Sequence, residues 1–431
     1  MRKGVGLLGT LVGAISVLFL ASTAYSQTVT ITYNDWHLAE KAWGASLRES
    51  VKAFESTHPN IKINAEPVSL AERNAKYVTA FEGGLGPDVY HVDDNSIALF
   101  IEKGYTYDVT PFINKEGKAF KDIFFDSGWE LLRRGQSYYG LPNNIAAMVL
   151  NYNQQMFKEA GLDPEKPPKT WEEFREYAKK LTRDTNKDGK IDQWGAGFVF
   201  GKASFHLRFT SILYSMGGRY LSEDNKKSLA NSPEVVKAVQ FLSDLQNVDK
   251  VFPPGIVNAG AHDVRILMAN RKIAMMVESI WTNSIVDSIN PDFKAAQTMR
   301  VAPVPGKPAT CAFASSWLMN KNTKNAAAAW EFMKFMSSKE RLQKDWDDST
   351  MLPARKDVAR EYRPLVNDPF ARMVASQIPN STFVPQIKEW PEIEDIFRAA
   401  VQSALTREMG IKEALDRANT QMQEILDKRS K

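Results

Sequence analysis

Pairs of acidic side chains are the first candidates for chemistry in this sequence, because enzymes that hydrolyse sugars hold two carboxylates a fixed distance apart. Adjacent residues on a strand or helix point in different directions, so adjacency alone gives little support for such a site. The sequence contains no Gly-x-Ser-x-Gly, His-Glu-x-x-His or phosphate-loop motif, and its five histidines are scattered. We therefore predict a protein that is not an enzyme and requires no cofactor, with a secreted glycoside hydrolase as the alternative. The acidic pairs are Asp93 with Asp94, Glu172 with Glu173, and Asp347 with Asp348.

Several aromatic residues have the chemistry of carbohydrate binding. A sugar ring presents a flat apolar face and an edge of hydroxyl groups, so its binding site combines aromatic rings with amides and carboxylates. Trp36, with His37 beside it, and Trp281 each follow a predicted strand, where ligands of α/β proteins bind. Tyr152 and Trp390 are further candidates near predicted strand ends or loops. For each single tryptophan the alternative is a place in the core, since large aromatic residues are mostly buried.

A predicted strand that begins at Asp88 ends in the sequence VDDN, residues 92–95. Asp88 precedes the strand, where it is expected to cap the strand entry. We therefore select Asp94 and Asn95, at the carboxyl end, as candidate ligand-binding residues.

The segment DTNKDGKID, residues 184–192, resembles a calcium loop of the EF-hand type. It carries oxygen-bearing side chains at positions one, three, five and nine, and glycine at position six. Position twelve, where a bidentate Glu is expected, is Gly195. A structural calcium ion and a polar turn without an ion both remain open. The candidate ligands are Asp184, Asn186, Asp188, Lys190 and Asp192.

Strand and helix periods alternate along the chain. Residues 29–33 alternate as a strand does, and a helix follows with Trp43, Leu47, Val51 and Phe54 on one face. Residues 170–181 begin with a capping box and carry a helical apolar stripe. This alternation predicts an α/β protein with helices at its C-terminus, and the length favours two domains.

The first residues have the three-part layout of a secretory signal peptide. Arg2 and Lys3 precede an uncharged stretch at residues 5–21, and small residues at Ala24 and Ser26 precede a polar chain. We expect cleavage near Ser26 and export to the periplasm, with an uncleaved anchor as the alternative.

The net charge of +4 is small for a chain of 431 residues and argues against nucleic acid or an anionic membrane as the main partner. Cys311 is the only cysteine, so no internal disulfide can form. We predict that it is a small buried apolar residue and not a reactive thiol.

An ordered set of segments carries a resemblance to a known family. FESTHPNIKIN, GGLGPDVYHVDD, YYGLPNN, LMANRKIAMMVESIW and VAPVPG follow one another in this sequence. In this order they resemble extracellular solute-binding proteins of bacterial ABC transporters, the carbohydrate-binding family that includes maltose-binding protein. The resemblance covers essentially the whole chain after residue 26.

The resemblance implies a two-lobed type II periplasmic binding protein whose lobes are discontinuous in sequence. The N-terminal lobe is expected to comprise residues 27–138 and 306–345, and the C-terminal lobe residues 139–305 and 346–431. Gly140 and Pro142 would form the first hinge, and residues 145–150 would be a central strand of the C-terminal lobe, buried on both faces. Residues 301–305 would form the second crossover.

The resemblance also implies a monomer that closes on a sugar and delivers it to the ABC transporter permease subunits. Asn143 and Asn144 would face the cleft, and Tyr152, Trp281 and Trp390 occupy positions where the family has ligand-contacting or aromatic residues.

Several positions depart from the family pattern or lack a clear role within it. Glu278 stands where small residues are common, so it would contact a ligand or be buried against an arginine. Phe313 would make the cleft wall bulkier, and the missing acid near Ala146 argues against malto-oligosaccharides. Adjacent Tyr138 and Tyr139 raise a ferric-ion receptor as an alternative, although their segment reads as a strand running into the hinge.

Overall fold

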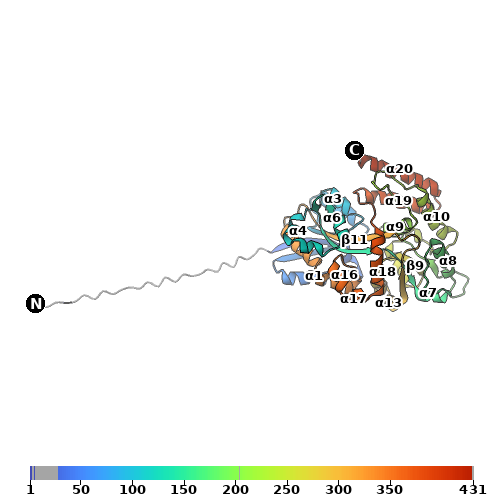
Figure 1. The fold of residues 1–431 in the computed structure, drawn as a ribbon, viewed down its shortest axis with the longest axis horizontal. Helices are drawn as coiled ribbons and strands as arrows, with labels where there is room; N and C mark the ends of the chain where they lie inside the picture. The colour runs from blue at the N-terminus through green and yellow to red at the C-terminus, as the bar shows by residue number, and fades with distance from the viewer. Residues whose placement is uncertain (2–3, 5–27, 203, 430–431) are drawn as a thin grey trace.

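The chain forms two lobes that lie side by side, each built around its own β-sheet (Figure 1). The computed structural model describes Met1, Gly4 and residues 28–202 and 204–429. Nearly all of the predicted signal peptide, residues 1–26, lies outside the described residues. Among the described residues no helix is both long and apolar enough to cross a membrane.

The first lobe contains a six-stranded sheet in which the order is β12-β11-β3-β1-β2 and β6 pairs with β11. Strands β1 and β2 are parallel and pair from Val29 opposite Ile61 to Asp35 opposite Pro67. Strand β11 runs antiparallel to β3 and β6. The strands are β1 (Val29–Asp35), β2 (Ile61–Pro67), β3 (Val89–Asp93), β6 (Leu141–Ala147), β11 (Thr310–Met319) and β12 (Ser381–Thr382), with a separate hairpin of β4 (Arg133–Arg134) and β5 (Ser137–Tyr138). The associated helices are η1 (Trp36–Ala39), α1 (Lys41–Thr57), α2 (Arg73–Glu82), α3 (Ile97–Glu102), α4 (Thr110–Glu116), α5 (Lys118–Asp122), α6 (Asp126–Leu132) and α14 (Ala326–Met336).

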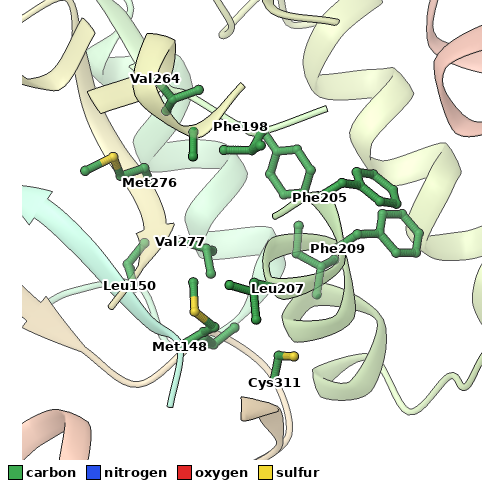
Figure 2. Packing of buried hydrophobic residues seen from close by; sticks show 14 of the residues in the cluster. Met148, Leu150, Phe198, Phe205, Leu207, Phe209, Val264, Met276, Val277 and Cys311 are labelled. Carbon is green, nitrogen blue, oxygen red and sulfur yellow. The ribbon is translucent and has the colours of Figure 1, made fainter. Parts of the chain in front are cut away.

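The second lobe contains a four-stranded sheet of order β10-β7-β9-β8. In its core, side chains from β7 and β9, and Met148 just before β7, pack toward those of α9, as Figure 2 shows for Met148, Leu150, Leu207 and Val277. The strands are β7 (Val149–Asn153), β8 (Trp194–Ala196), β9 (Ile273–Glu278) and β10 (Met299–Ala302). The helices are α7 (Gln154–Glu159), α8 (Trp171–Leu181), α9 (Phe205–Ser215), α10 (Pro233–Asn247), η2 (Ile256–Asn258), α11 (Ala261–Ala269), α12 (Thr282–Ile289), η3 (Pro291–Phe293), α13 (Ala295–Thr298), α19 (Trp390–Leu405) and α20 (Ile411–Arg429).

A group of helices lies where the two lobes meet. One of them, α15, contacts α1 of the first lobe and α12 of the second, and α18 contacts β6 and β10 (Figure 1). These helices therefore tie the lobes together beside the strands through which the chain crosses. They are α15 (Lys339–Ser349), α16 (Lys356–Glu361), α17 (Arg363–Asn367) and α18 (Pro369–Gln377), followed by η4 (Ile378–Asn380).

The helices predicted from periodicity form as expected. Trp43, Leu47, Val51 and Phe54 are all buried on one face of α1. At the start of α8, the Thr170 hydroxyl accepts a hydrogen bond from the backbone N–H of residue 173. An amphipathic stripe and a cap were sufficient to locate these elements.

The prediction that residues 145–150 form one central strand of the second lobe is wrong. Residues 141–147 belong to β6 and pair with β11 in the first sheet, and β7 of the second sheet begins only at Val149. Between them, the backbone N–H of Met148 donates to the carbonyl oxygen of Cys311 at 3.0 Å. The chain therefore leaves the first sheet near Met148 and not at residue 139. Every residue of both strands is buried, so their hydrophobicity could not reveal the change of sheet. The other predicted lobe boundaries stay predictions.

Candidate functional site

Two neighbouring cavities lie between the lobes and share part of their lining, and together they are called the cleft. The larger, about 610 Å³, is lined by α2 and the residues around the end of β3 on one side, and by the starts of α9 and α19 on the other. The smaller, about 50 Å³, is lined by residues of η1, by Trp281 and by Phe313 of β11. Leu70, Asp93 and Ser204 line both cavities. Phe313 therefore forms part of the cleft wall.

Trp36 and His37 reach the cleft because β1 ends in a carboxylate that fixes the turn after it. Asp35 accepts a hydrogen bond from the backbone N–H of His37 at 2.8 Å and so caps η1. The Trp36 ring is stacked on His91 with centroids 4.1 Å apart, and the guanidinium of Arg73 lies 4.6 Å from its centroid. These two groups already contact the Trp36 ring, so its stacking capacity is partly used within the protein.

The charges beneath η1 are held in fixed states. Burial by itself raises the pKa of Asp35, but the neighbouring His91 and His37 rings outweigh burial and lower it. Burial lowers the pKa of His37 to about 3, so His37 is neutral at physiological pH. His91 Nδ1 lies 3.1 Å from Asp35, and its Nε2 lies 2.7 Å from the hydroxyl of Ser315. Asp35 and the two histidines bring one ligand atom each within 4.8 Å, a spacing that suits a metal ion, but His91 uses both nitrogens within the protein.

Glu278 is buried against two arginines and contacts Trp281. It is fully buried in β9 and forms ion pairs with Arg208 and, at 3.1 Å, with Arg265. Although burial raises its pKa, the two guanidinium groups prevail and lower it, so Glu278 is ionised. Its second oxygen accepts a hydrogen bond from Trp281 Nε1 at 2.7 Å. Of the two roles open for Glu278, the structure has it buried against arginines, where it orients Trp281 in the wall of the smaller cavity.

Of the two adjacent acids at the end of β3, Asp93 lines the cleft and the predicted Asp94 does not. Asp93 pairs with Arg73 of α2 at 2.7 Å, and both line the larger cavity. Asp94 lines neither cavity and accepts a hydrogen bond from the backbone N–H of Ala314 at 3.2 Å. Burial raises the pKa of Asp94 to about 7.

Asn95 and Trp390 meet across the cleft. Asn95 lines the larger cavity, and its side-chain oxygen accepts a hydrogen bond from Trp390 Nε1 at 2.5 Å. Trp390 is 1% exposed and packs edge-on against Tyr220, so it lines neither cavity. These two predicted residues therefore come together as a contact between the lobes, reinforced by a hydrogen bond from Gln386 to the carbonyl oxygen of Asp94 at 3.1 Å.

Three predicted residues lie away from the cavities. Asn143 and Asn144 are buried in β6 and line neither cavity; the Asn143 amide lies 3.3 Å from His91 Nε2. Tyr152 is buried in the core of the second lobe, where its hydroxyl donates to the carbonyl oxygen of Pro164 at 2.7 Å. The prediction that Tyr152 contacts the ligand is wrong, because its position in β7 turns it toward the core.

Sequence reasoning missed several cleft residues. Trp43 was assigned only to the buried face of α1, although it also lines the smaller cavity. Nothing in the sequence linked Arg73 to Asp93 or Arg208 to Glu278, because each pair joins distant parts of the chain. For Arg208, the available signal was a single arginine in a segment without an acidic residue, and the structure buries it with nine other residues of α9.

The predicted calcium loop is an exposed turn whose carboxylates bond to its own backbone. Asp184 accepts hydrogen bonds from the N–H groups of Lys187 and Gly189 at 2.6 and 2.7 Å. Asp192 accepts from the N–H and hydroxyl of Thr185. Such bonds suit either a turn alone or a preformed loop for an ion, so calcium binding stays a prediction.

The adjacent tyrosines behind the ferric-ion alternative are not part of the cleft. Tyr138 lies in the hairpin strand β5, where its hydroxyl contacts the ammonium group of Lys121. Neither Tyr138 nor Tyr139 lines either cavity.

Comparison with known proteins identifies the fold and the family. A model of the bacterial extracellular solute-binding proteins matches residues 39–341. The chain belongs to this family. The solute-binding protein is similar to the ABC transporter solute-binding protein of Thermotoga lettingae bound with alpha-D-tagatose, with a TM-score of 0.83 and 26% identity, covering 92% of this chain and 100% of that one. The predicted two-lobed periplasmic binding protein fold is thus confirmed.

Two relatives are named for ligands of different charge. The solute-binding protein is 23% identical over 418 residues to the multiple sugar-binding protein of Streptococcus mutans, and the alignment covers 94% of each chain. It is 25% identical over 421 residues to the sn-glycerol-3-phosphate-binding periplasmic protein of Escherichia coli, and the alignment covers 93% of each chain.

Proposed function

We propose that this solute-binding protein is a periplasmic receptor that captures a sugar between its lobes and delivers it to the permease of an ABC importer. The observation that carries the proposal is the cleft itself. It combines four aromatic rings, of Trp36, Trp43, Trp281 and Phe313, with the charged side chain of Asp93 beside them. Flat rings next to directional polar groups match a molecule with an apolar face and a hydroxyl edge.

Binding would act by shifting the population of open and closed lobes. A sugar that contacts Asp93 of the first lobe and Trp281 of the second makes contacts available only when the lobes are close. The hydrogen bond between Asn95 and Trp390 favours the same closed arrangement without a ligand. The permease would then recognise the closed form, and the sugar would be released chemically unaltered.

A thermal-shift screen against a broad saccharide library tests the proposal, because a ligand that binds only the native state raises the melting temperature. For a sugar that raises it, we expect Trp281→Ala to weaken binding at least tenfold by isothermal titration calorimetry. Trp281→Phe is the matched control, since it keeps an aromatic face and loses only the hydrogen bond to Glu278. Unchanged affinity in Trp281→Ala would remove the proposed stacking surface.

The same preparation separates a receptor from a glycoside hydrolase. A receptor returns each bound sugar intact, so chromogenic glycosides incubated with the protein should release no chromophore while a library sugar still binds. Turnover that disappears in Asp93→Asn would support the hydrolase instead.

A further inference from the structure

Two buried titratable side chains act on each other from opposite lobes. His206 lies in the first turn of α9 in the second lobe, and Asp94 directly follows β3 in the first. We infer that these two side chains, here called the proton latch, hold one proton between them when the lobes close, so that closure and ligand capture weaken as the pH rises above neutrality. The inference depends on the two-lobed fold and adds control by pH to the proposed function.

On the second lobe, Glu394 of α19 fixes the orientation of the His206 ring. One of its carboxylate oxygens lies 3.1 Å from His206 Nδ1 and accepts a hydrogen bond from the His206 backbone N–H at 3.2 Å. Because a carboxylate accepts and cannot donate, Nδ1 carries a proton whether the ring is neutral or charged. Nε2 is buried without a hydrogen-bond partner in the described part of the chain, and His206 lines the larger cavity together with Asp93. The proton that comes and goes with pH is therefore the one on Nε2.

Asp94 on the first lobe has the complementary deficiency. Its Oδ1 accepts a hydrogen bond from the backbone N–H of Ala314, whereas its Oδ2 is buried and lacks a partner among the described residues. Burial raises the pKa of Asp94 to about 7, and the charge of His206 opposes this rise. Burial by itself lowers the pKa of the histidine, but Glu394, Asp94 and Asp93 outweigh burial and raise it. Each member of the latch thus changes the charge state of the other.

The number of protons on the latch decides how stable the closed state is. One proton gives either an imidazolium beside a carboxylate or an imidazole beside a carboxylic acid, and in both forms a donor is available for an acceptor. With no proton, a carboxylate oxygen and a ring nitrogen are both buried as acceptors without a donor, which costs free energy. The closed state therefore keeps one proton on the latch to a higher pH than the open state does.

The direction of the pH effect follows from the two states. Once the lobes separate, water reaches both groups, and the latch titrates near the ordinary pKa values of 3.8 for Asp94 and 6.5 for His206. Between about pH 4.5 and 6 the open latch also holds one proton, on the histidine, so closure depends little on pH there. Above pH 6.5 the open latch loses that proton while the closed latch retains it. The stabilisation of the closed state is thus complete below pH 6.5 and is lost as the pH rises through about 7 and beyond.

The other charged groups near the latch keep their partners within one lobe. Burial raises the pKa of Asp93, but its ion pair with Arg73 on the same lobe outweighs burial and lowers it. His91 also acts on Asp93, but its ring is bonded to Asp35 within the first lobe and keeps that environment in both states. Burial raises the thiol pKa of Cys311 in β11 well above its ordinary value, so the thiol stays neutral. The remaining charged side chains around His206 all belong to the second lobe and are Lys202 paired with Asp395, Arg208 paired with Glu278, and Glu392.

Proton uptake on ligand binding tests the latch in the wild type. The full mature protein is titrated calorimetrically with a sugar from the thermal-shift screen, in two buffers of different ionisation enthalpy, since the difference in heat reports the protons taken up. For a closed-state pKa about half to one unit above 6.5, we expect uptake of about 0.3 to 0.6 proton at pH 7 and less than about 0.1 at pH 5.5. The affinity should fall about three- to tenfold between pH 6 and pH 8.5 and change less than about twofold between pH 5 and pH 6.

Variants of the two latch residues test which groups hold the proton. His206→Gln keeps an amide that can donate to Glu394 but cannot titrate, and Asp94→Asn supplies an amide donor in place of the acid. Each variant should abolish the proton uptake and reduce the change in affinity between pH 6 and pH 8.5 to less than about twofold. His262→Gln is the matched control, because His262 is an exposed histidine of α11 that lines neither cavity, and it should leave both quantities as in the wild type.

The possible outcomes separate the latch from the proposed function. An affinity that does not change with pH, the absence of proton uptake, or uptake that persists in both latch variants would overturn the inference while sugar binding stands. If no carbohydrate binds, the proposed function fails, and small-angle X-ray scattering of the unliganded protein decides the latch. The radius of gyration should then be smaller at pH 6 than at pH 8.5 in the wild type and equal at the two pH values in His206→Gln. Equal radii in the wild type would overturn the latch.

Discussion

Replacement of Asp94 by Asn should stabilise the protein at alkaline pH and have almost no effect at acidic pH. Asp94 is 1% exposed at the end of β3, and its Oδ2 is among the buried atoms that lack a hydrogen-bond partner in the described residues. Burial raises its pKa from 3.8 to about 7, and the adjacent Asp93 acts in the same direction. His206, across the cleft, and the backbone hydrogen bond from Ala314 oppose the rise without cancelling it.

The sign of the effect follows from proton binding. Between pH 3.8 and about 7 the folded state keeps the Asp94 proton while the unfolded state releases it. The stability that this group contributes is therefore complete below about pH 4, is lost progressively up to pH 7, and stays lost above it. A pKa difference from 3.8 to about 7 corresponds to at most about 4 kcal/mol, at about 1.36 kcal/mol for each pKa unit.

Urea unfolding of the wild type and of Asp94→Asn at pH 4.5 and pH 8 measures this difference directly. We expect the variant to gain about 2 to 4 kcal/mol at pH 8 and less than about 1 kcal/mol at pH 4.5. His206 and the other titrating groups are common to both proteins, so most of their contribution cancels. Asp126→Asn is the control, because its side chain is 90% exposed and should give no pH-dependent difference. A gain that is equal at both pH values, or larger at pH 4.5, would refute the reasoning.

Three further changes have distinct expected results. Glu278→Ala should lower the free energy of unfolding in urea by about 3 to 5 kcal/mol, because it leaves two buried guanidinium groups without a carboxylate. The control is Glu159→Ala, at an exposed ion pair, which should lower it by no more than about 1 kcal/mol. Equal losses in the two variants would contradict the account. Trp390→Phe removes the hydrogen bond to Asn95, so calorimetry should find the sugar affinity reduced about two- to tenfold. This corresponds to a loss of about 0.5 to 1.5 kcal/mol in binding free energy. Unchanged affinity would show that this contact does not favour closure. Calcium should raise the melting temperature of the wild type but not of Asp188→Ala, and the absence of any shift in the wild type would leave the loop as a plain turn.

Local patterns in the sequence predicted the elements whose causes are local. The apolar stripe and cap of α8, the buried face of α1 and the position of Trp281 after β9 were all visible because each depends on residues close together in the chain. The family resemblance supplied the two-lobed architecture, which periodicity alone could not provide.

The parts that failed depend on contacts between distant segments. The apolar run around Met148 looks the same whether it forms one strand or two strands in different buried sheets, so the crossover could not be placed. In the same way, the choice of Asp94 over Asp93 required knowledge of which neighbour turns toward Arg73 of α2. Tyr152 failed because an aromatic residue within a buried strand has the same sequence pattern on either side of the sheet.

Small-angle X-ray scattering with and without a saturating sugar from the library tests the central claim most directly, because capture by lobe closure makes the molecule more compact. The account predicts a smaller radius of gyration in the presence of a sugar that calorimetry shows to bind with one-to-one stoichiometry, and a return to the initial profile once the intact sugar is dialysed away. Identical profiles with and without a bound sugar, or recovery of a cleaved sugar, would contradict it.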